Sequence, residues 1–288
     1  MASSNFKQVL NRVKLKCLAS ISPRLAGQFA TKLFVTSRND ANPHRKAFTP
    51  IGAKAIPVTQ ANSAVKNIYI WGDQGEIVLL VHGWGAECGS MFGFASTLVK
   101  QGFRVATFDG PAHGSSKGEF STMSAYVRET KTVIKQLSEL GSVTRVVAHS
   151  LGGIVALAAT AHNPDIKKIA LVSTPKSLSD VLDIWSGSFA KLKKTVKTEI
   201  RKQLLIDNGV PVSHWDVGLH GNGSDADILI LHSSDDPIVP ASHAETIESI
   251  LPTGKLEVLS GLGHIRILSN PKTLDHVSSF FEVEPSTH

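Results

Sequence analysis

One short apolar strand that ends abruptly at a serine constrains this sequence more than any other feature. Residues 144–153 read T-R-V-V-A-H-S-L-G-G. Val146, Val147 and Ala148 predict a buried strand, and residues 152–158, two glycines followed by five apolar residues, predict an apolar helix, which leaves three residues for the turn between them. A turn this tight forces its middle residue into strained backbone angles and raises the side chain above the sheet. Ser150 is therefore the candidate nucleophile.

The neighbours of Ser150 are small, as such a turn requires. Ala148 and Gly152 stand where a G-x-S-x-G turn has its two glycines, so the pattern here is A-x-S-x-G, a departure of one methyl group that we expect the turn to tolerate. The alternative interpretation is a serine that only caps a helix, since serine is a favoured N-cap residue. The rest of the chain has to decide between the two.

Length, composition and cysteine content indicate a globular protein. A chain of 288 residues with 42% hydrophobic content can bury the core of one large α/β domain that carries an insertion. Basic residues interrupt the first 20 positions, so we expect no signal peptide, and no stretch approaches the length of a membrane span. Two cysteines, Cys17 and Cys88, do not make a disulfide framework. We therefore expect a cytoplasmic protein.

The formal charge of +6 raises the question of an anionic partner. Aromatic residues make up only 6% of the chain, the basic residues are not interleaved with stacking rings, and no nucleic-acid-binding motif occurs. We expect no nucleic-acid partner.

The amino-terminal stretch predicts two helices. Residues 5–18 form a basic amphipathic helix, and a second helix runs from Pro23 to Val35, followed by a proline-punctuated surface loop at 39–50. We expect the apolar face of the first helix to pack on the main body; weak contact with a membrane surface is the alternative. That face consists of Phe6, Val9, Leu10, Val13 and Cys17.

Strands and helices alternate from residue 66 onward, which predicts a mostly parallel sheet covered on both sides. The alternation breaks between residues 176 and 225, which we interpret as an inserted helical cap. The predicted organisation is an N-terminal helical extension at 1–60, a first core part at 61–175, the cap at 176–225 and a second core part at 226–288. The strands are expected near 67–71, 77–81, 103–109, 146–148, 168–175, 227–232 and 256–260.

The cap contains a helical apolar stripe with basic residues opposite. We expect the stripe to cover the mouth above Ser150, with Trp185, Phe189 and Trp215 lining an apolar substrate pocket. The basic face is expected in solvent; recruitment of an anionic substrate or lipid is the alternative. The stripe is Phe189, Leu192, Val196, Ile200 and Leu204, and the basic residues are Lys191, Lys194, Arg201 and Lys202.

Five motifs in chain order resemble those of the α/β-hydrolase family. They are V-H-G-W-G at 81–85, F-D-G-P-A-H-G-S at 108–115, A-H-S-L-G-G at 148–153, H-S-S-D-D-P-I-V-P at 232–240 and G-L-G-H at 261–264. The resemblance covers the chain from about residue 66 to the end. It implies the α/β-hydrolase fold, a mostly parallel doubly wound sheet with a helical cap, and an esterase- or lipase-like serine hydrolase.

Chemistry assigns a role to the serine, the histidine and the acid of these motifs. Serine is a weak nucleophile at neutral pH, so His264 has to accept its proton, and a carboxylate has to fix the histidine tautomer. The resemblance places that acid directly before Pro237, at Asp236 rather than Asp235. It also implies that the amides of Trp84 and Leu151 bind the oxyanion. We expect His82 to be a hydrogen-bonded structural residue.

The predicted function is hydrolysis of carboxylic esters by two-step acyl transfer to water, with a small ester or acyl compound as substrate. A thioesterase, lactonase, amidase or cofactor-free peroxidase would use the same three residues, and a binding protein without turnover is the alternative of another class. We expect no cofactor and no metal, since the histidines lack metal-ligand spacing. The oligomeric state stays open.

Overall fold

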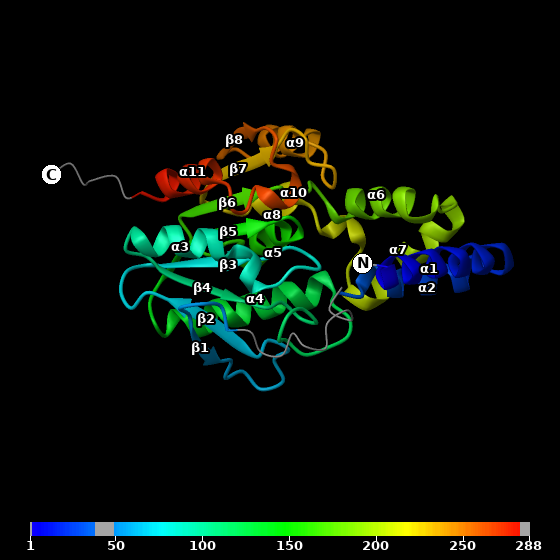
Figure 1. The fold of residues 1–288 in the computed structure, drawn as a ribbon, viewed down its shortest axis with the longest axis horizontal. Coiled ribbons are helices and arrows are strands. Elements are labelled where there is room, and N and C mark those ends of the chain that lie inside the picture. Colours follow the sequence, from blue (N-terminus) through cyan, green and yellow to red (C-terminus); the bar gives the residue numbers. More distant parts are fainter. Residues whose placement is uncertain (1, 38–48, 283–288) are drawn as a thin grey trace.

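The computed structural model describes residues 2–37 and 49–282, whose strands form one eight-stranded sheet with helices on both faces (Figure 1). The strand order is β1-β2-β4-β3-β5-β6-β7-β8. All pairs from β4 to β8 are parallel, and β1 and β2 add two antiparallel pairs at one edge. The predicted mostly parallel, doubly wound sheet is confirmed.

The strands are β1 (Lys54–Pro57), β2 (Asn67–Trp71), β3 (Ile77–Val81), β4 (Arg104–Phe108), β5 (Val143–His149), β6 (Lys168–Val172), β7 (Asp227–Ser233) and β8 (Gly254–Leu259). The α-helices are α1 (Ala2–Ile21), α2 (Pro23–Val35), α3 (Phe92–Lys100), α4 (Met123–Ser138), α5 (Leu151–Thr160), α6 (Leu178–Ala190), α7 (Lys194–Asn208), α8 (Val217–Gly221), α9 (Ser242–Ile250), α10 (Gly263–Arg266) and α11 (Pro271–Phe281). Two short 3₁₀ helices are η2 (Cys88–Met91) and η3 (Val212–His214).

Two hydrophobic cores, one on each face of the sheet, hold the layers together. Side chains of α3 and α11, among them Phe94 and Phe281, cover one face. Helices α4, α5 and α9 cover the other face, which Tyr126 and Ile154 help to fill. Strand β5 lies in the middle of the sheet and every residue in it is buried, because apolar surface is removed from water on both sides.

Most predicted elements lie where the sequence patterns put them. Helix α2 begins and ends at the predicted residues, and Asn270 caps α11 by accepting a hydrogen bond from the amide of Lys272. Strand β1 was not predicted, since it is short, largely exposed and ends in a proline. Most of the predicted loop at 39–50 lies outside the described residues.

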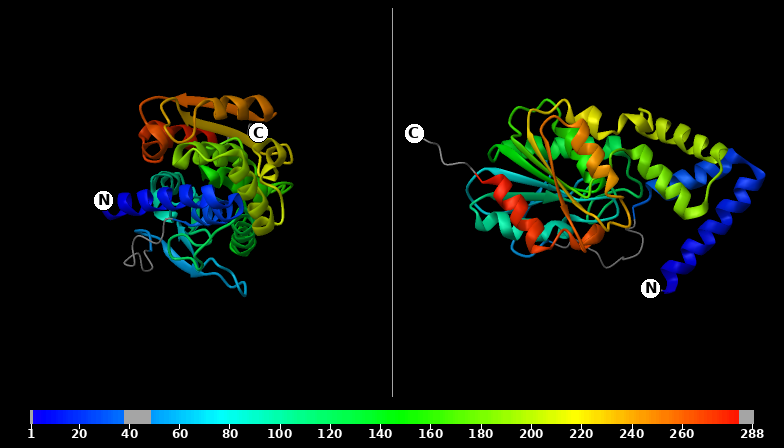
Figure 2. Two further views of the ribbon diagram at one scale, coloured as in Figure 1. Left: turned by 90° about the vertical axis from the view of Figure 1, so that its right-hand side faces the viewer. Right: turned by 90° about the horizontal axis from the view of Figure 1, so that it is seen from above.

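Residues 176–225 contain helices and no strand, with α6, α7, η3 and α8 in that order. Helices α6 and α7 lie beside α1 and α2, away from the sheet, whereas α8 packs on α5 and α9 (Figures 1 and 2). The described part of the chain therefore has a group of four helices, α1, α2, α6 and α7, which we call the helical cap. The predicted domain boundaries stay a prediction.

The predicted apolar stripe does not lie on one helix, since a break between α6 and α7 divides it, and its buried part does not pack against the mouth that we expected. Helix α2 packs along α7 and covers it, with Ala26, Gly27 and Ala30 at the contact. A Cβ atom on Gly27 would lie 2.4 Å from Cβ of Glu199, so the helices approach more closely than any larger residue would allow. The expectation failed because the partner of this stripe comes from a helix more than 160 residues earlier in the chain. The buried stripe residues are Leu192, Val196, Ile200 and Leu204.

The packing prediction for α1 is wrong. Val9, Leu10 and Val13 are 55%, 56% and 54% exposed, and Cys17 is exposed too. Helix α1 instead packs through Leu15, which is fully buried and lies on the other side of the helix. The side chain of Phe6 lies outside the described residues.

The α2–α7 contact can be tested with one substitution at two helical glycines. Gly27→Ala should lower the free energy of unfolding by about 1–3 kcal/mol, because the new methyl group overpacks the contact with Glu199. Gly187→Ala is the matched control, since nothing lies within 4 Å of its Cβ position, and it should raise stability by about 0.5–1 kcal/mol. Urea unfolding measures both. Equal stabilisation by the two substitutions would contradict the close packing.

Candidate active site

Ser150 lies between β5 and α5 in a strained conformation. Its φ and ψ are 53° and −132°, in a region that residues with a side chain rarely adopt. The Ser150 amide donates to the carbonyl of Val172 at 2.9 Å, which fixes the turn to the neighbouring strand. A Cβ on Gly152 would lie 2.5 Å from the carbonyl oxygen of His82, so this position has to be glycine. The predicted turn geometry is confirmed.

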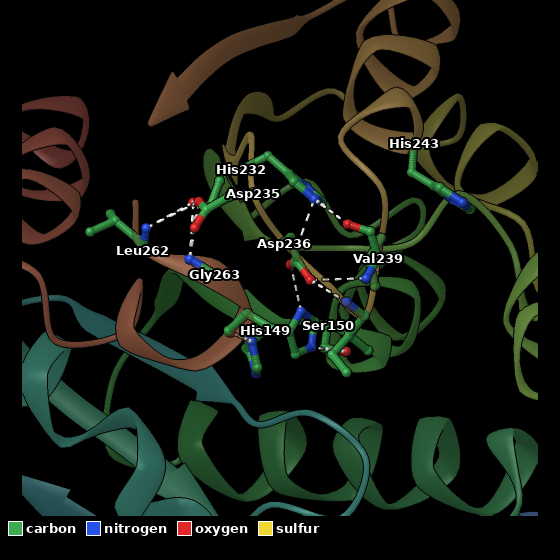
Figure 3. A network of polar contacts seen from close by, with 12 residues as sticks. His149, Ser150, His232, Asp235, Asp236, Val239, His243, Leu262 and Gly263 are labelled. Atoms are coloured by element: carbon green, nitrogen blue, oxygen red, sulfur yellow. Dashed lines mark hydrogen bonds and ion pairs between the residues drawn. The ribbon is translucent and has the colours of Figure 1, made fainter. Parts of the chain in front are cut away.

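Three residues distant in sequence meet at the carboxyl ends of β5 and β7. Nε2 of His264 lies 3.1 Å from Oγ of Ser150, and Nδ1 of His264 lies 2.7 Å from Oδ2 of Asp236. The other carboxylate oxygen, Oδ1, accepts hydrogen bonds from the amides of Ile238 and Val239 at 2.8 and 2.9 Å. The structure thus brings together the serine, histidine and acid that the motifs singled out (Figure 3).

The environment of Asp236 keeps its carboxyl group ionised. Burial raises the pKa of Asp236, but the hydrogen bonds from His264 and from the amides of Val239 and Ile238 outweigh burial, so that the net pKa lies below its ordinary value. An ionised carboxylate only accepts hydrogen bonds. Nδ1 of His264 therefore carries the proton, and Nε2 presents a lone pair to the hydroxyl of Ser150.

Asp235, the other candidate acid, is exposed and points elsewhere. Its carboxylate accepts hydrogen bonds from the hydroxyl of Ser233 and from the amides of Leu262 and Gly263, at 2.5, 3.2 and 3.3 Å (Figure 3). The bond from Ser233 is the main cause of the lowered pKa of Asp235. Asp235 thus holds the loop that carries His264 and makes no contact with the imidazole among the described contacts.

The two predicted oxyanion donors are the backbone amide of Leu151, which follows Ser150 directly, and that of Trp84, in the loop after β3. Among the described hydrogen bonds, none uses the amide of Trp84 or Leu151, whereas the amides of Ser150, Gly85 and Gly153 all have acceptors. A Cβ on Gly83 would lie 2.9 Å from Cβ of Ser150, so the loop after β3 runs against the serine. The oxyanion role of the two amides stays a prediction.

His113 fixes the position of this loop, a role that the sequence did not reveal. Its Nε2 accepts a hydrogen bond from the amide of Gly85 at 3.0 Å and its Nδ1 donates to the carbonyl of Pro111 at 2.8 Å. Burial, followed by the nearby His82, lowers the pKa of His113 to about 3. The ring stays neutral at physiological pH, and it can therefore keep accepting from Gly85.

Asp109 and His82 extend the same network. The carboxylate of Asp109 accepts from the amides of Cys88 and Ser115, both at 2.8 Å. His82 is fully buried; its Nδ1 donates to the carbonyl of Gly83 and its Nε2 accepts from the amide of Gly110. The structural role predicted for His82 is confirmed. The signal for the network was the loop F-D-G-P-A-H-G-S, to which the sequence assigned no task.

His149, next to Ser150, is buried against the candidate histidine. Its Nε2 donates to the carbonyl of His264 at 3.0 Å, and the two ring centroids are 4.8 Å apart. Burial, and then the charge of His264, lower the pKa of His149 to about 3. A neutral ring at this position can hold His264 without adding a competing positive charge.

The aromatic residues predicted to bind substrate contact residues of the helical cap, of η3 and of α8. The ring centroid of Trp185 lies 5.2 Å from the ring centroids of both Phe34 and Phe189. Trp215 is 4% exposed and packs against His214 and His220. These contacts tie Trp185 and Phe189 to α2, and a direct part in substrate binding stays a prediction for all three residues.

The basic face of α7 is partly neutralised within the cap. Arg201 forms an ion pair with Asp183 at 2.9 Å, and Lys202 forms one with Glu199 at 2.7 Å. These two of the four predicted basic residues therefore present less positive charge than the sequence pattern indicates. In residues 2–37 and 49–282, no group of three or more His, Cys, Asp or Glu side chains could hold a metal ion.

Comparison with known proteins identifies the fold. A family model described as alpha/beta hydrolase fold matches residues 76–207. An esterase of Pyrococcus furiosus superposes with a TM-score of 0.63 at 20% identity, over 79% of this chain and 91% of that one. The chain has the α/β-hydrolase fold.

Curated relatives of this hydrolase-fold chain are distant. An esterase of Escherichia coli K12, YjfP, is 25% identical over 233 residues, which cover 71% of this chain and 87% of the esterase. A non-heme haloperoxidase of Rhodococcus erythropolis is 24% identical over 277 residues, covering 79% of this chain and all of the relative. The resemblance inferred from the motifs is therefore confirmed at the level of the fold.

The buried histidines predict a pH-dependent stability. The pKa of His149 is about 3 in the folded protein and about 6.5 in an unfolded chain, so the unfolded state binds more protons between these values. The free energy of unfolding should then fall as the pH is lowered from 6.5 toward 3, by up to about 1.4 kcal/mol per pH unit for this residue. His149→Gln should reduce this slope by the contribution of about one bound proton, and urea unfolding at several pH values from 4 to 7 measures the slope. An unchanged slope would contradict a buried neutral His149.

Proposed function

We propose that this protein hydrolyses carboxylic esters through Ser150, His264 and Asp236. The observation that carries the proposal is the continuous hydrogen-bonded row from Asp236 through His264 to Ser150, at 2.7 and 3.1 Å, with the serine on a strained turn. A serine that only capped a helix would need neither the imidazole nor the carboxylate. The esterases among the relatives support the same chemistry at low identity.

In the proposed first step, Oγ of Ser150 attacks the ester carbonyl carbon while Nε2 of His264 takes the hydroxyl proton. The carbonyl oxygen becomes negatively charged, and the amides of Trp84 and Leu151 donate to it. Asp236 stabilises the imidazolium that forms and holds the ring in the tautomer needed. The imidazolium then protonates the alcohol as the C–O bond breaks, which leaves an acyl group on Ser150.

In the second step, water attacks the acyl group. Nε2 of His264 now takes a proton from the water, a second tetrahedral intermediate forms in the same oxyanion site, and its collapse returns the proton to Oγ of Ser150. The products are an acid and an alcohol. The two steps together consume one ester and one water molecule and regenerate free Ser150. No cofactor enters the proposed cycle.

A second candidate is acyl transfer to hydrogen peroxide, which the haloperoxidase relative favours. Hydrogen peroxide would replace water in the second step and take the acyl group from Ser150, so that the product is a peracid. Ser150 and His264 would keep the same roles. Assaying peracid formation from an ester and peroxide, in competition with hydrolysis, separates the two activities. A hydrolysis rate that peroxide does not divert favours the esterase.

The expected substrate is a small ester or acyl compound, and a reducing cytoplasm is the proposed location, since Cys17 and Cys88 are both free thiols. Thioesters, lactones and amides contain the same electrophilic carbonyl. p-Nitrophenyl esters of graded acyl length, beside a thioester and a lactone series, would rank these classes by kcat/KM.

Ser150→Ala tests the nucleophile. The variant should fold normally and lose on the order of 10⁵–10⁶-fold in kcat for a p-nitrophenyl ester, because it lacks the attacking oxygen. Ser116→Ala is a control serine change at a hydroxyl that donates to the carbonyl of Asp109 and should keep turnover within about tenfold of the wild type. Turnover by Ser150→Ala at the wild-type rate would show that Ser150 is not the nucleophile.

The neighbouring aspartates give the acid assignment a matched pair. Asp236→Asn should lose about 10⁴-fold in kcat, because the amide favours the wrong tautomer of His264. Asp235→Asn makes the same chemical change one residue earlier and should lose about tenfold or less, since its Oδ1 can still accept from Leu262 and Gly263. Steady-state kinetics on one ester decide the ranking, and the reverse order would place the acid at Asp235.

A further inference from the structure

The exposed face of α1 is apolar and is bordered by basic residues. At 100° per residue, its apolar positions fall within an arc of about 120°. Lys14 and Lys16 lie about 20° beyond the two edges of this arc. The apolar face consists of Val9, Leu10, Val13, Cys17 and Ile21, of which the four aliphatic residues are 55%, 56%, 54% and 76% exposed.

Contacts within the cap fix the direction of this face. Leu15 is fully buried on the opposite side of the helix. The guanidinium of Arg12 lies 5.3 Å from the ring centre of Phe189 on α6, and the ammonium of Lys14 lies 4.7 Å from that of Phe29 on α2. Helix α1 is thereby held along both flanks and lies at the outer side of the cap (Figure 2), with its apolar face exposed.

The charge of the chain is concentrated at the same end. Six of the 30 Lys and Arg residues lie in residues 1–37, which contain no Asp or Glu. The remaining 24 are balanced by the 24 acidic residues of the rest of the chain. The net charge of +6 is therefore a property of the amino-terminal segment, and no acidic side chain there reduces its attraction to an anionic surface.

We propose that α1 binds an anionic lipid surface, with its axis in the plane of the membrane. The face formed by Val9, Leu10, Val13, Cys17 and Ile21 enters the boundary between headgroups and acyl chains, and the basic residues along its edges contact anionic headgroups. None of the described helices has the length and apolar composition to cross a bilayer, so this binding is peripheral. The proposal does not depend on the proposed function.

The charge pattern favours lipid over a second copy of the chain. Pairing two α1 helices through their apolar faces would bring Lys14 and Lys16 of both copies together, with no acidic residue on either helix to compensate. An anionic membrane satisfies the apolar face and both basic edges at once.

Cosedimentation of the full-length protein with vesicles tests the proposal. Vesicles of phosphatidylcholine with about 30% phosphatidylserine should bind at least about tenfold more protein than phosphatidylcholine alone, and added salt should weaken the binding. Val9→Ser/Val13→Ser and Lys16→Glu should each reduce binding about fivefold or more. Matched controls are Ile51→Ser/Val258→Ser, at residues 75% and 52% exposed, and Lys272→Glu on α11, none of which should change binding. Circular dichroism checks that each variant is folded.

Cys17 offers a direct probe of insertion. Cys88 is 2% exposed and burial raises the pKa of its thiol, so a maleimide dye reacts with Cys17 first. An environment-sensitive dye at Cys17 should shift to the blue and brighten on vesicles that contain phosphatidylserine. Equal binding to neutral vesicles, absence of binding, or equal losses in the control variants would overturn the proposal. So would a concentration-dependent dimer that Val9→Ser/Val13→Ser abolishes, with no vesicle binding by the wild type.

Discussion

The backbone of Ser150 is the constraint on which the site depends. A φ of 53° at a residue with a side chain costs free energy, and the surrounding structure has to hold it in place. The Ser150 amide is held by Val172 of the next strand, and the helix that follows starts against the carbonyl of His82 at a position that only glycine can occupy. The strain raises the hydroxyl to the edge of the sheet, where the loops after β3 and β8 can reach it.

Once the serine is fixed, the remaining groups are held by polar contacts that differ in kind. Asp236 orients His264 directly, whereas Asp235 and His149 act on the backbone of the histidine loop. On the other side, His113 holds the amide of Gly85, next to the proposed donor Trp84. The low pKa values of both buried histidines keep them neutral, and this neutrality is what lets His113 accept from Gly85.

The sheet and the three central side chains could be predicted because their signals are local. Buried strands are continuous apolar runs, and the motifs around Ser150 and Asp236 each follow such a strand, whereas the motif of His264 follows the partly exposed strand β8. The helical cap could not be predicted to the same depth, because each of its helices has more than one face that could be buried. Leu15 packs and Val13 does not, and this outcome depends on α2 and α6, which the sequence of α1 does not encode. The support by His113 was missed for a similar reason, since its partner Gly85 is 28 residues away.

The central claim is that Ser150 acts as a nucleophile, and covalent labelling tests it most directly. The pure protein is incubated with a fluorophosphonate, which reacts with serines activated by a neighbouring base, and the modified peptide is located by mass spectrometry. The account predicts one adduct per chain, on Ser150, whose formation His264→Ala abolishes while the protein stays folded. An unlabelled wild-type protein, or a label on a different residue, would contradict it.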